Sequence, residues 1–428
     1  MSWLLKFRLR EELRAGIWLI PSCCGLGGLL VGMGMWRLDR WAGWTLVQYT
    51  HEGATALTAA IVTATLTFVG TAFTVLLVAA QFASSQLTPR ALKISLGDPL
   101  YRIALGLFVW TFVYAMVIVA RISTDFIPQA SVSLAALLTM SSLVTYLILI
   151  GHLGRSLRPV NVAGRVGREG RRTLERMYPD PQADHPTPGV DTTAARPPTR
   201  TLHHPGPAGI LLAFDAAGLA AEARRCNAEV MLVPAVGDFV RRGAPLFRLF
   251  ESTQQPMNER LLLHSVATGR ERTLEQDTRF PFRILVDVAI RALSPAVNDP
   301  TSAVMAIDQL HELLAYLGPR RLDIGRYRDA DGRVRAMAEM PSWDDYVSLA
   351  VDEIRHFGTG SVQIMRRLRA MLDDLGEIVP DERKAAIRRE LQLLAQAVER
   401  GFPDQEDRVG ASQPDQQGLG SSPPISSP

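Results

Sequence analysis

The chain has 428 residues, enough for two or three domains of ordinary size. Its apolar share of 47% and charged share of 21% resemble a soluble protein, but residues 15–154 are largely apolar, whereas charge and proline dominate from residue 155 onward. A net charge of +3 is close to balance. This distribution excludes a simple soluble enzyme and also a transporter that fills the membrane along its whole length.

Four apolar windows predict a transmembrane domain over residues 1–155. They cover about residues 15–36, 56–81, 103–120 and 130–151, and a helix needs about 20 apolar residues to cross a membrane. The basic N-terminus before the first window is typical of a signal peptide. That window is unusually long and no Ala-x-Ala site follows it, so we expect an uncleaved first span.

The positions of Lys and Arg predict the direction of the spans. Fourteen of them lie in the N-terminal segment, in the loop between spans two and three, and just after span four. The opposite loops hold three, namely Arg37, Arg40 and Arg121. Because short cytoplasmic loops are enriched in positive residues, we expect both termini and the whole C-terminal part to be cytoplasmic.

Two spans carry patterned small or polar residues. Gly28 and Gly32 have the GxxxG spacing that favours close helix packing. In span two, spacings of 4, 4 and 3 place four hydroxyls on one stripe: Thr63, Thr67, Thr71 and Thr74. Either each hydroxyl bonds a carbonyl of its own or a neighbouring helix, or the stripe lines a polar path in an oligomer. None of the spans has a central charge, which argues against an ion-coupled transporter but not against a channel.

The next segments predict a linker and a small β module. Residues 156–208 are basic and then rich in proline, as in an extended connector. The module spans residues 209–252, with a strand at 209–215, a helix at 216–227, a strand at 229–234 and a turn-rich segment at 236–246. The last segment resembles one edge of a biotinyl or lipoyl carrier domain. It contains no lysine, which excludes a swinging-arm role.

Residues 253–400 predict a helical cytoplasmic domain, and residues 401–428 a disordered tail. Apolar spacings of 3 and 4 indicate a small helical bundle. Within it, Pro295 ends one helix, while Asp299 and Pro300 suit the cap and first position of a helix over 300–317. A capped corner explains this pattern, and the alternative is that the helix start, with Arg291 nearby, binds an anion or small ligand.

Motifs for chemistry are missing from the sequence. It contains no phosphate-binding loop, no GxSxG, no HExxH and no calcium loop. His203 and His204 lack partners at metal spacing, and the arginines are mixed with acidic residues rather than aromatic ones. We therefore predict no catalytic residues, no cofactor, no metal and no nucleic acid partner. The sequence does not exclude an enzyme, but none of its motifs supports one.

Three phrases carry a resemblance to a known family: AQFASSQLTPR at 80–90, RTLEQD at 272–277 and ALSPAVNDP at 292–300. Together with the layout, they resemble a bacterial family of predicted integral membrane proteins catalogued as domain of unknown function 2254. The likeness covers about residues 9–398 and implies a bacterial inner (plasma) membrane. It assigns no role to the signature or ligand-corner positions, which are Arg272, Thr273, Asp277, Arg291, Ser294, Pro295, Asn298, Asp299 and Pro300.

The expected fold class is an α-helical membrane domain of four transmembrane helices plus a cytoplasmic α+β region with a small β module and a helical bundle. Two functions fit it. One is an oligomeric inner-membrane channel or permeability regulator, gated by the cytoplasmic domain. The other is a membrane-anchored sensor or scaffold without a pore. The expected partners are the lipid bilayer and further copies of the chain, and the sequence identifies no small ligand or protein partner.

Overall fold

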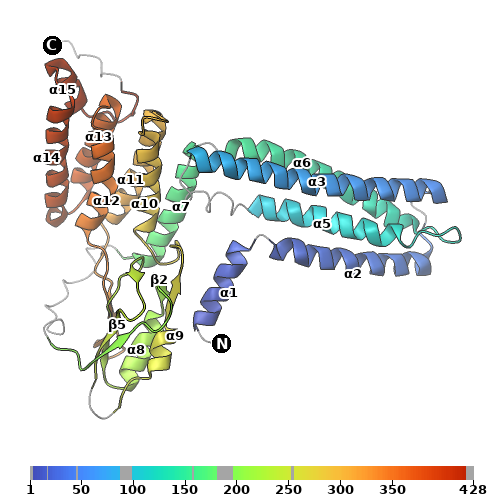
Figure 1. The fold of residues 1–428 in the computed structure, drawn as a ribbon, viewed down its shortest axis with the longest axis horizontal. Helices are drawn as coiled ribbons and strands as arrows, with labels where there is room; N and C mark the ends of the chain where they lie inside the picture. Colours follow the sequence, from blue (N-terminus) through green and yellow to red (C-terminus); the bar gives the residue numbers. More distant parts are fainter. Residues whose placement is uncertain are drawn as a thin grey trace. The chain divides into compact units, whose positions relative to one another are not determined.

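The chain folds into two compact units, each described here by itself (Figure 1). The computed structural model describes residues 3–16, 18–44, 47–86, 99–156, 159–180, 196–251 and 255–420. Residues 11–162 form the membrane unit, and residues 1–10 with 163–428 form the sheet–bundle unit. The predicted class, apolar helices followed by a mixed helical and small-sheet region, is confirmed.

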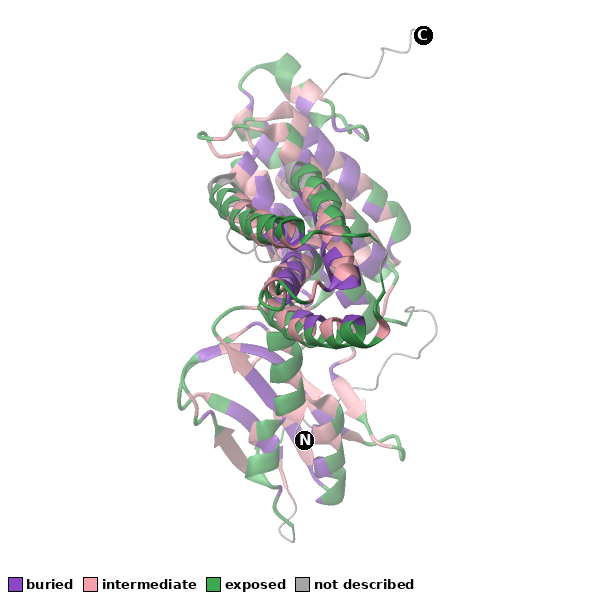
Figure 2. Ribbon diagram, turned by 90° about the vertical axis from the view of Figure 1, so that its right-hand side faces the viewer, coloured by how far each residue is buried: buried purple, intermediate pink, exposed green. Residues whose placement is uncertain are grey.

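The membrane unit contains four helices that are long and apolar enough to cross a membrane. They lie side by side in Figure 1 and match the four predicted windows to within a few residues at most ends. Their bounds are α2 (Leu19–Ala42), α3 (His51–Gln86), α5 (Pro99–Val119) and α6 (Gln129–Ser156). Figure 2 shows much of their outer surface exposed, as expected for helices whose solvent is lipid.

Small residues let α2 approach α5 closely. A Cβ added at Gly28 would lie 2.7 Å from the backbone oxygen of Trp110, and one at Gly32 would lie 3.0 Å from Val117. The first distance is too short for any contact and the second is tighter than an ordinary one, so the missing side chains let α2 pack this closely. The predicted packing role of the glycine pair is therefore confirmed.

The end of this unit where α2 finishes and α6 begins is closed by polar and aromatic contacts. The buried Asp39 carboxylate accepts a hydrogen bond from Ser131 N at 2.8 Å and a longer one from Ala130 N at 3.4 Å, which satisfies free amides at the start of α6. The guanidinium of Arg121 lies 4.5 Å from the centre of the Trp36 ring. Here an acidic residue near a helix end acts as a cap for its neighbour.

The sheet–bundle unit contains two sheets. The larger has the strand order β1–β5–β3–β8–β7, with β3 and β8 parallel and the other pairs antiparallel, and the smaller has the order β4–β2–β6. The strands are β1 (Arg200–His203), β2 (Gly209–Phe214), β3 (Glu229–Leu232), β4 (Phe239–Val240), β5 (Pro245–Phe250), β6 (Val266–Gly269), β7 (Arg326–Arg328) and β8 (Val334–Ala338). The predicted module therefore also uses strands from before residue 209 and after residue 252.

Helices make up the rest of this unit, and the last residues of α1 and the first residues of α7 belong to the membrane unit. The helix α8 packs on β3, β7 and β8, while α10 to α14 pack on one another as a bundle. Their bounds are α1 (Trp3–Ala15), α7 (Pro159–Met177), α8 (Ala216–Arg225), α9 (Glu259–His264), α10 (Phe280–Ala292), α11 (Pro300–Leu317), α12 (Trp343–Phe357), α13 (Val362–Ile378), α14 (Lys384–Gly401) and α15 (Gln405–Ser412). The predicted helix over 300–317 coincides with α11.

The predicted connector over 156–208 contains two ordered elements, α7 and β1. Glycine lets α7 pack closely on the bundle, since a Cβ added at Gly167 would lie 2.1 Å from Gln309 Oε1 and one at Gly170 would lie 2.6 Å from Pro281. The buried Leu174 adds core contacts. A piece that begins at residue 209 would therefore lack part of the unit's core, whereas residues 181–195 of the connector lie outside the described part.

The tail also differs from the expected disorder. Residues 405–412 form α15, and the segment that follows is held by Arg366, whose side chain is buried. Arg366 donates hydrogen bonds to Gln413 O at 3.3 Å and Gly420 O at 3.1 Å, and Asp415 accepts from Gly420 N at 2.7 Å. A buried guanidinium needs acceptors, and this tail supplies backbone carbonyls. Residues 421–428 lie outside the described residues.

Candidate functional site at the junction of sheets and bundle

The RTLEQD phrase and Thr278 after it form a short connection between β6 and α10, called here the junction segment (residues 272–278). Thr173 Oγ1 of α7 donates a hydrogen bond to Leu274 O at 2.7 Å. The side-chain amide of Gln276 pairs with the backbone of Phe214 in β2, accepting from its N at 3.0 Å and donating to its O at 3.1 Å. The segment thus fastens a strand and a helix that are far apart in the sequence.

Asp277 is the most enclosed charged group of the junction segment, with a side chain 2% exposed. Its carboxylate accepts hydrogen bonds from Phe280 N at 3.1 Å and Arg279 N at 3.2 Å, which caps the start of α10, and from Arg272 Nη1 at 3.1 Å. Burial raises the pKa of Asp277, and the positive charges of Arg272 and Arg279 oppose this rise.

Contacts with the junction segment also explain why residue 237, in the turn after β3, is a glycine. Gly237 has a φ of +96°, and a Cβ there would lie 2.5 Å from Asp277 Oδ2 and 3.0 Å from Arg272 Nη1. Both the backbone conformation and the space require glycine. Gly237 lies in the predicted turn-rich segment over 236–246, but its neighbours Asp277 and Arg272 were not predictable from the local pattern.

Buried hydroxyls continue from the junction segment into the bundle. The hydroxyl of Thr278 is hydrogen-bonded to that of Tyr346 in α12, which lies 3.0 Å from the hydroxyl of Tyr178 after α7. Burial raises the pKa of both tyrosines above the usual value for the residue. Both phenols therefore stay protonated near neutral pH, so they join helices rather than exchange protons. The buried hydroxyl of Thr273, by contrast, has no hydrogen-bond partner in the described part of the chain.

The ALSPAVNDP corner is a capped turn between α10 and α11. Asp299 Oδ1 accepts from Ser302 N at 3.1 Å, Pro300 occupies the first turn of α11, and Asp299 N donates to Ala292 O at 2.8 Å. Ser294 Oγ donates to Arg291 O at 2.7 Å. The predicted cap is confirmed. Because the Asp299 carboxylate already lies on the helix start, a second anion there would meet its negative charge, so anion binding at this corner stays a prediction.

The signature residues do not converge on one site. Arg272, Thr273 and Asp277 precede α10, whereas the residues from Arg291 to Pro300 lie at its other end. A helix of 13 residues is about 20 Å long. The signature residues therefore lie at two separate corners of the fold and do not form one pocket. Residues 80–86 of the phrase AQFASSQLTPR form the last part of α3, and its last four residues lie outside the described part.

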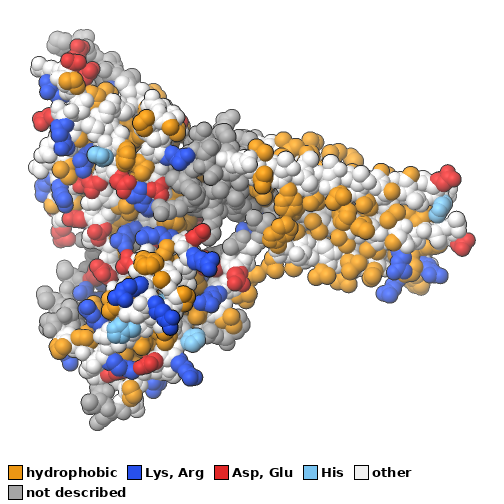
Figure 3. Space-filling view, in the orientation of Figure 1, with side chains coloured by type: hydrophobic (Ala, Val, Ile, Leu, Met, Phe, Trp, Pro, Cys, Tyr) orange, Lys and Arg blue, Asp and Glu red, His pale blue; other side chains and the backbone are white. Residues whose placement is uncertain are grey.

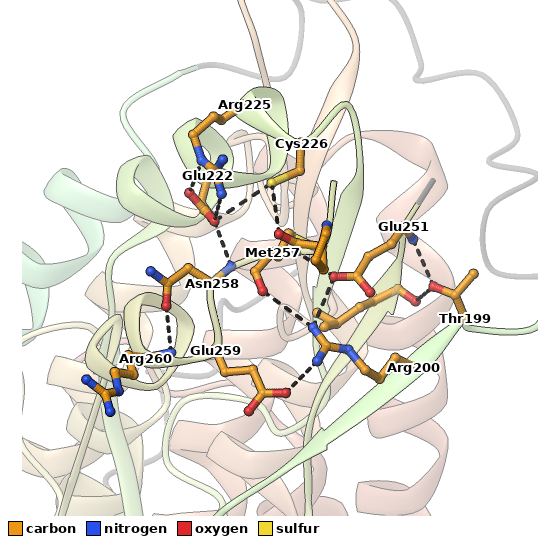
Figure 4. Close-up of polar contacts among 12 residues, drawn as sticks. Thr199, Arg200, Glu222, Arg225, Cys226, Glu251, Met257, Asn258, Glu259 and Arg260 are labelled. Carbon is orange, nitrogen blue, oxygen red and sulfur yellow. Dashed lines mark hydrogen bonds and ion pairs between the residues drawn. The ribbon is translucent and has the colours of Figure 1, made fainter. Parts of the chain in front are cut away.

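A further polar cluster, missed from the sequence, fastens the edge of the larger sheet (Figure 4). Arg200 of β1 is hydrogen-bonded to Glu251 at 3.1 Å and also to Glu259, while Glu222 accepts from Asn258 N at 2.8 Å. Cys226 lies beside Glu222 in a buried position, and desolvation raises the pKa of its thiol. A thiol that stays protonated is a poor nucleophile, and the contacts of Arg200 hold β1 to the segments that carry Glu251 and Glu259.

The threonine stripe lies on the outer face of α3. Thr63, Thr67 and Thr74 are exposed and Thr71 is half-buried. Each hydroxyl donates to the carbonyl four residues earlier, at distances of 3.1, 2.9, 2.8 and 3.0 Å in chain order. The interpretation that the hydroxyls bond their own helix is therefore confirmed. Nothing in these contacts tests a polar path through an oligomer.

Metal ligation has no candidate among the described residues, where no three His, Cys, Asp or Glu side chains gather closely enough to hold an ion. His204 instead uses its ring nitrogen for a contact of 3.0 Å with Pro207 O.

Taken together, the fold and the two corners define a class of protein: four apolar helices joined to a sheet–bundle unit that carries two of the three phrases, at 272–277 and 292–300. The chain belongs to the family described as Predicted membrane protein (DUF2254), whose sequence profile matches residues 14–374.

Similar proteins include uncharacterized proteins of Mycobacterium tuberculosis and Mycobacterium bovis. Each is 28% identical over 416 residues, covering 93% of this chain and 79% of the relative. No solved structure matches the chain.

Proposed function

We propose that the protein is an oligomeric channel or permeability regulator of the bacterial inner membrane, with both termini and the sheet–bundle unit in the cytoplasm. The direction rests on the Lys and Arg distribution given above. Hydrophobic side chains cover much of the visible face of the four helices, and charged side chains gather at one tip of them (Figure 3). This surface suits a lipid environment.

The observation that carries the proposal is the exposed face of α3. Six exposed small or hydroxyl residues follow one another at spacings of 4, 3, 4, 3 and 4, and they are Ala56, Ala60, Thr63, Thr67, Gly70 and Thr74. This α3 seam has the period of 3.5 residues at which two helices pack along their length. Small residues let helix backbones approach closely in lipid, so the seam suits a second copy of the chain.

Three threonines of the seam offer oxygen atoms along the same line. Because each hydroxyl proton is already donated to the helix backbone, the lone pairs of Thr63, Thr67 and Thr74 face outward. In an oligomer with α3 at the centre, these atoms would line a path without a fixed charge. The sheet–bundle unit follows α6 in the chain, so a movement of that unit would be transmitted to the spans through α7.

The second candidate is a membrane-anchored scaffold or sensor without a pore. This candidate is favoured if the α3 seams of two copies pack directly on each other and exclude water. Glycine and alanine leave no room for water between tightly packed backbones. Both candidates use the same seam, so the test must measure water access as well as association.

The test uses the full chain in liposomes, with Cys23, Cys24 and Cys226 replaced by Ala. Thr67→Cys is compared with Leu137→Cys on α6, whose side chain is 63% exposed but lies outside the seam. A channel predicts that a charged, water-soluble thiol reagent modifies position 67 and changes ion flux, with position 137 unaffected.

Three outcomes are separated by this design. Cross-linking of two copies at position 67 without reagent access or flux supports the scaffold instead. The absence of cross-linking, reagent access and flux at seam positions, in protein shown to be inserted, refutes association through α3.

A further inference from the structure

The first helix, α1, carries an apolar stripe that is exposed in the described structure. Leu5, Leu9 and Leu13 recur every four residues and therefore lie on one face. Their side chains are 52%, 46% and 46% exposed. On another face, the rings of Trp3 and Phe7 stack at 5.4 Å. A row of three exposed leucines on a short helix is an unpartnered apolar surface.

The short connection between α1 and α2 limits the distance between this stripe and the membrane. Ala15 ends α1 and Leu19 begins α2, the first apolar helix. The three residues between them span at most about 14 Å when fully extended. If α2 crosses the membrane, the end of α1 therefore lies at its surface. This step depends on the four-span topology proposed above.

Charged residues flank the stripe in the manner of an interfacial helix. Lys6 and Arg8 are exposed on its two sides, and the exposed Glu12 lies on the same side as Arg8. Arg10 follows Leu9 and is thus about 100° around the helix, where its Nη1 lies 3.5 Å from the Glu275 carboxylate of the junction segment. Arg10 therefore has a partner within the protein. The exposed Lys6 and Arg8 can instead bind anionic lipid headgroups.

We propose that α1 lies on the cytoplasmic surface of the membrane, with Leu5, Leu9 and Leu13 among the acyl chains and Lys6 and Arg8 at anionic headgroups. The ion pair of Arg10 with Glu275 then links this interfacial helix to the junction segment. The partner is the lipid surface, and the anionic headgroup is the part that the basic side chains recognise.

A nitroxide scan of the full chain in liposomes tests this arrangement. In the variant without native cysteines, single substitutions Leu5→Cys, Leu9→Cys and Leu13→Cys are labelled, with Arg8→Cys and Glu12→Cys as matched controls on the flanking faces. Collisions with oxygen, which concentrates in lipid, are compared with collisions with a water-soluble nickel chelate. We expect oxygen to dominate at the three leucines, the chelate to dominate at positions 8 and 12, and the contrast to weaken when phosphatidylglycerol is left out.

Two results would overturn the proposal. Leucine positions as open to the chelate as position 8 would show that α1 stands in water. Leucine positions closed to both reagents would show that protein, such as a second copy, covers the stripe. A nitroxide at Leu137→Cys serves as the reference for insertion: if it reports acyl chains while α1 does not, α1 is misplaced and the four-span topology stands. If position 137 itself is in water, the topology fails.

Discussion

Replacing Asp277 by Ala should destabilise the sheet–bundle unit strongly, because three interactions depend on one carboxylate. The loss of a helix cap costs about 1 kcal/mol. Removal of one partner of a buried ion pair costs about 3–5 kcal/mol, but the Arg272 side chain is 31% exposed and stays partly hydrated, so about 1–2 kcal/mol applies here. We expect a total loss of about 2–3 kcal/mol in the free energy of unfolding.

Asp277→Asn is the matched control. An asparagine oxygen still accepts from the first amides of α10, and the neutral side chain avoids the cost of burying a charge. We expect it to cost less than about 1 kcal/mol. If Asp277→Ala is as stable as the native chain, or if Asn is as damaging as Ala, the described role of the carboxylate is wrong.

The pH dependence of the native chain supplies a second check. Burial raises the pKa of Asp277 in the folded state, so the folded protein holds this proton more tightly than the unfolded chain. Its contribution to stability is therefore fully present below the unfolded pKa and is lost as pH rises through the folded pKa. Asp277→Asn should remove this part of the pH dependence.

Urea unfolding of a soluble piece spanning residues 159–420 can measure these differences. The piece contains one tryptophan, Trp343, which is buried at the start of α12 and donates to Arg383 O at 3.2 Å. Its fluorescence therefore reports the unfolding of the helical bundle. A shift in the midpoint with an unchanged slope would indicate a change in stability rather than in the extent of unfolding.

Two further predictions use the same measurement. Burial, together with the neighbouring carboxylate of Asp352, raises the pKa of Glu390 in α14, so its stabilising contribution is lost as pH rises. Glu390→Gln should therefore increase the stability above neutral pH, and an unchanged or lower midpoint would contradict this. Ending the piece at Ser412 removes both carbonyl acceptors of Arg366 and should cost about 2 kcal/mol. In an Arg366→Met background, the same truncation should cost clearly less, and an equal cost would show that Arg366 does not hold the tail.

Local pattern was enough to predict the four apolar helices and the start of α11. The four apolar windows match α2, α3, α5 and α6, because burial in lipid requires a long apolar run whatever the rest of the chain does. Asp299 and Pro300 were recognised as the start of α11, since a cap acts within one helical turn.

Contacts between distant parts of the chain required the tertiary structure. The strand β8 pairs in parallel with β3 about a hundred residues earlier, and the junction segment contacts α7, β2 and α12 in turn. Nothing within a few residues of Gln276 or Thr278 indicates these partners.

The ordered tail shows the same limit, because its composition predicts disorder whereas the buried Arg366 supplies the partner that orders it. Sequence alone thus determined which segments prefer lipid or a helix, since those preferences arise from neighbouring residues. The fold decided which polar groups meet, since each buried donor or acceptor must find a partner wherever the chain brings one.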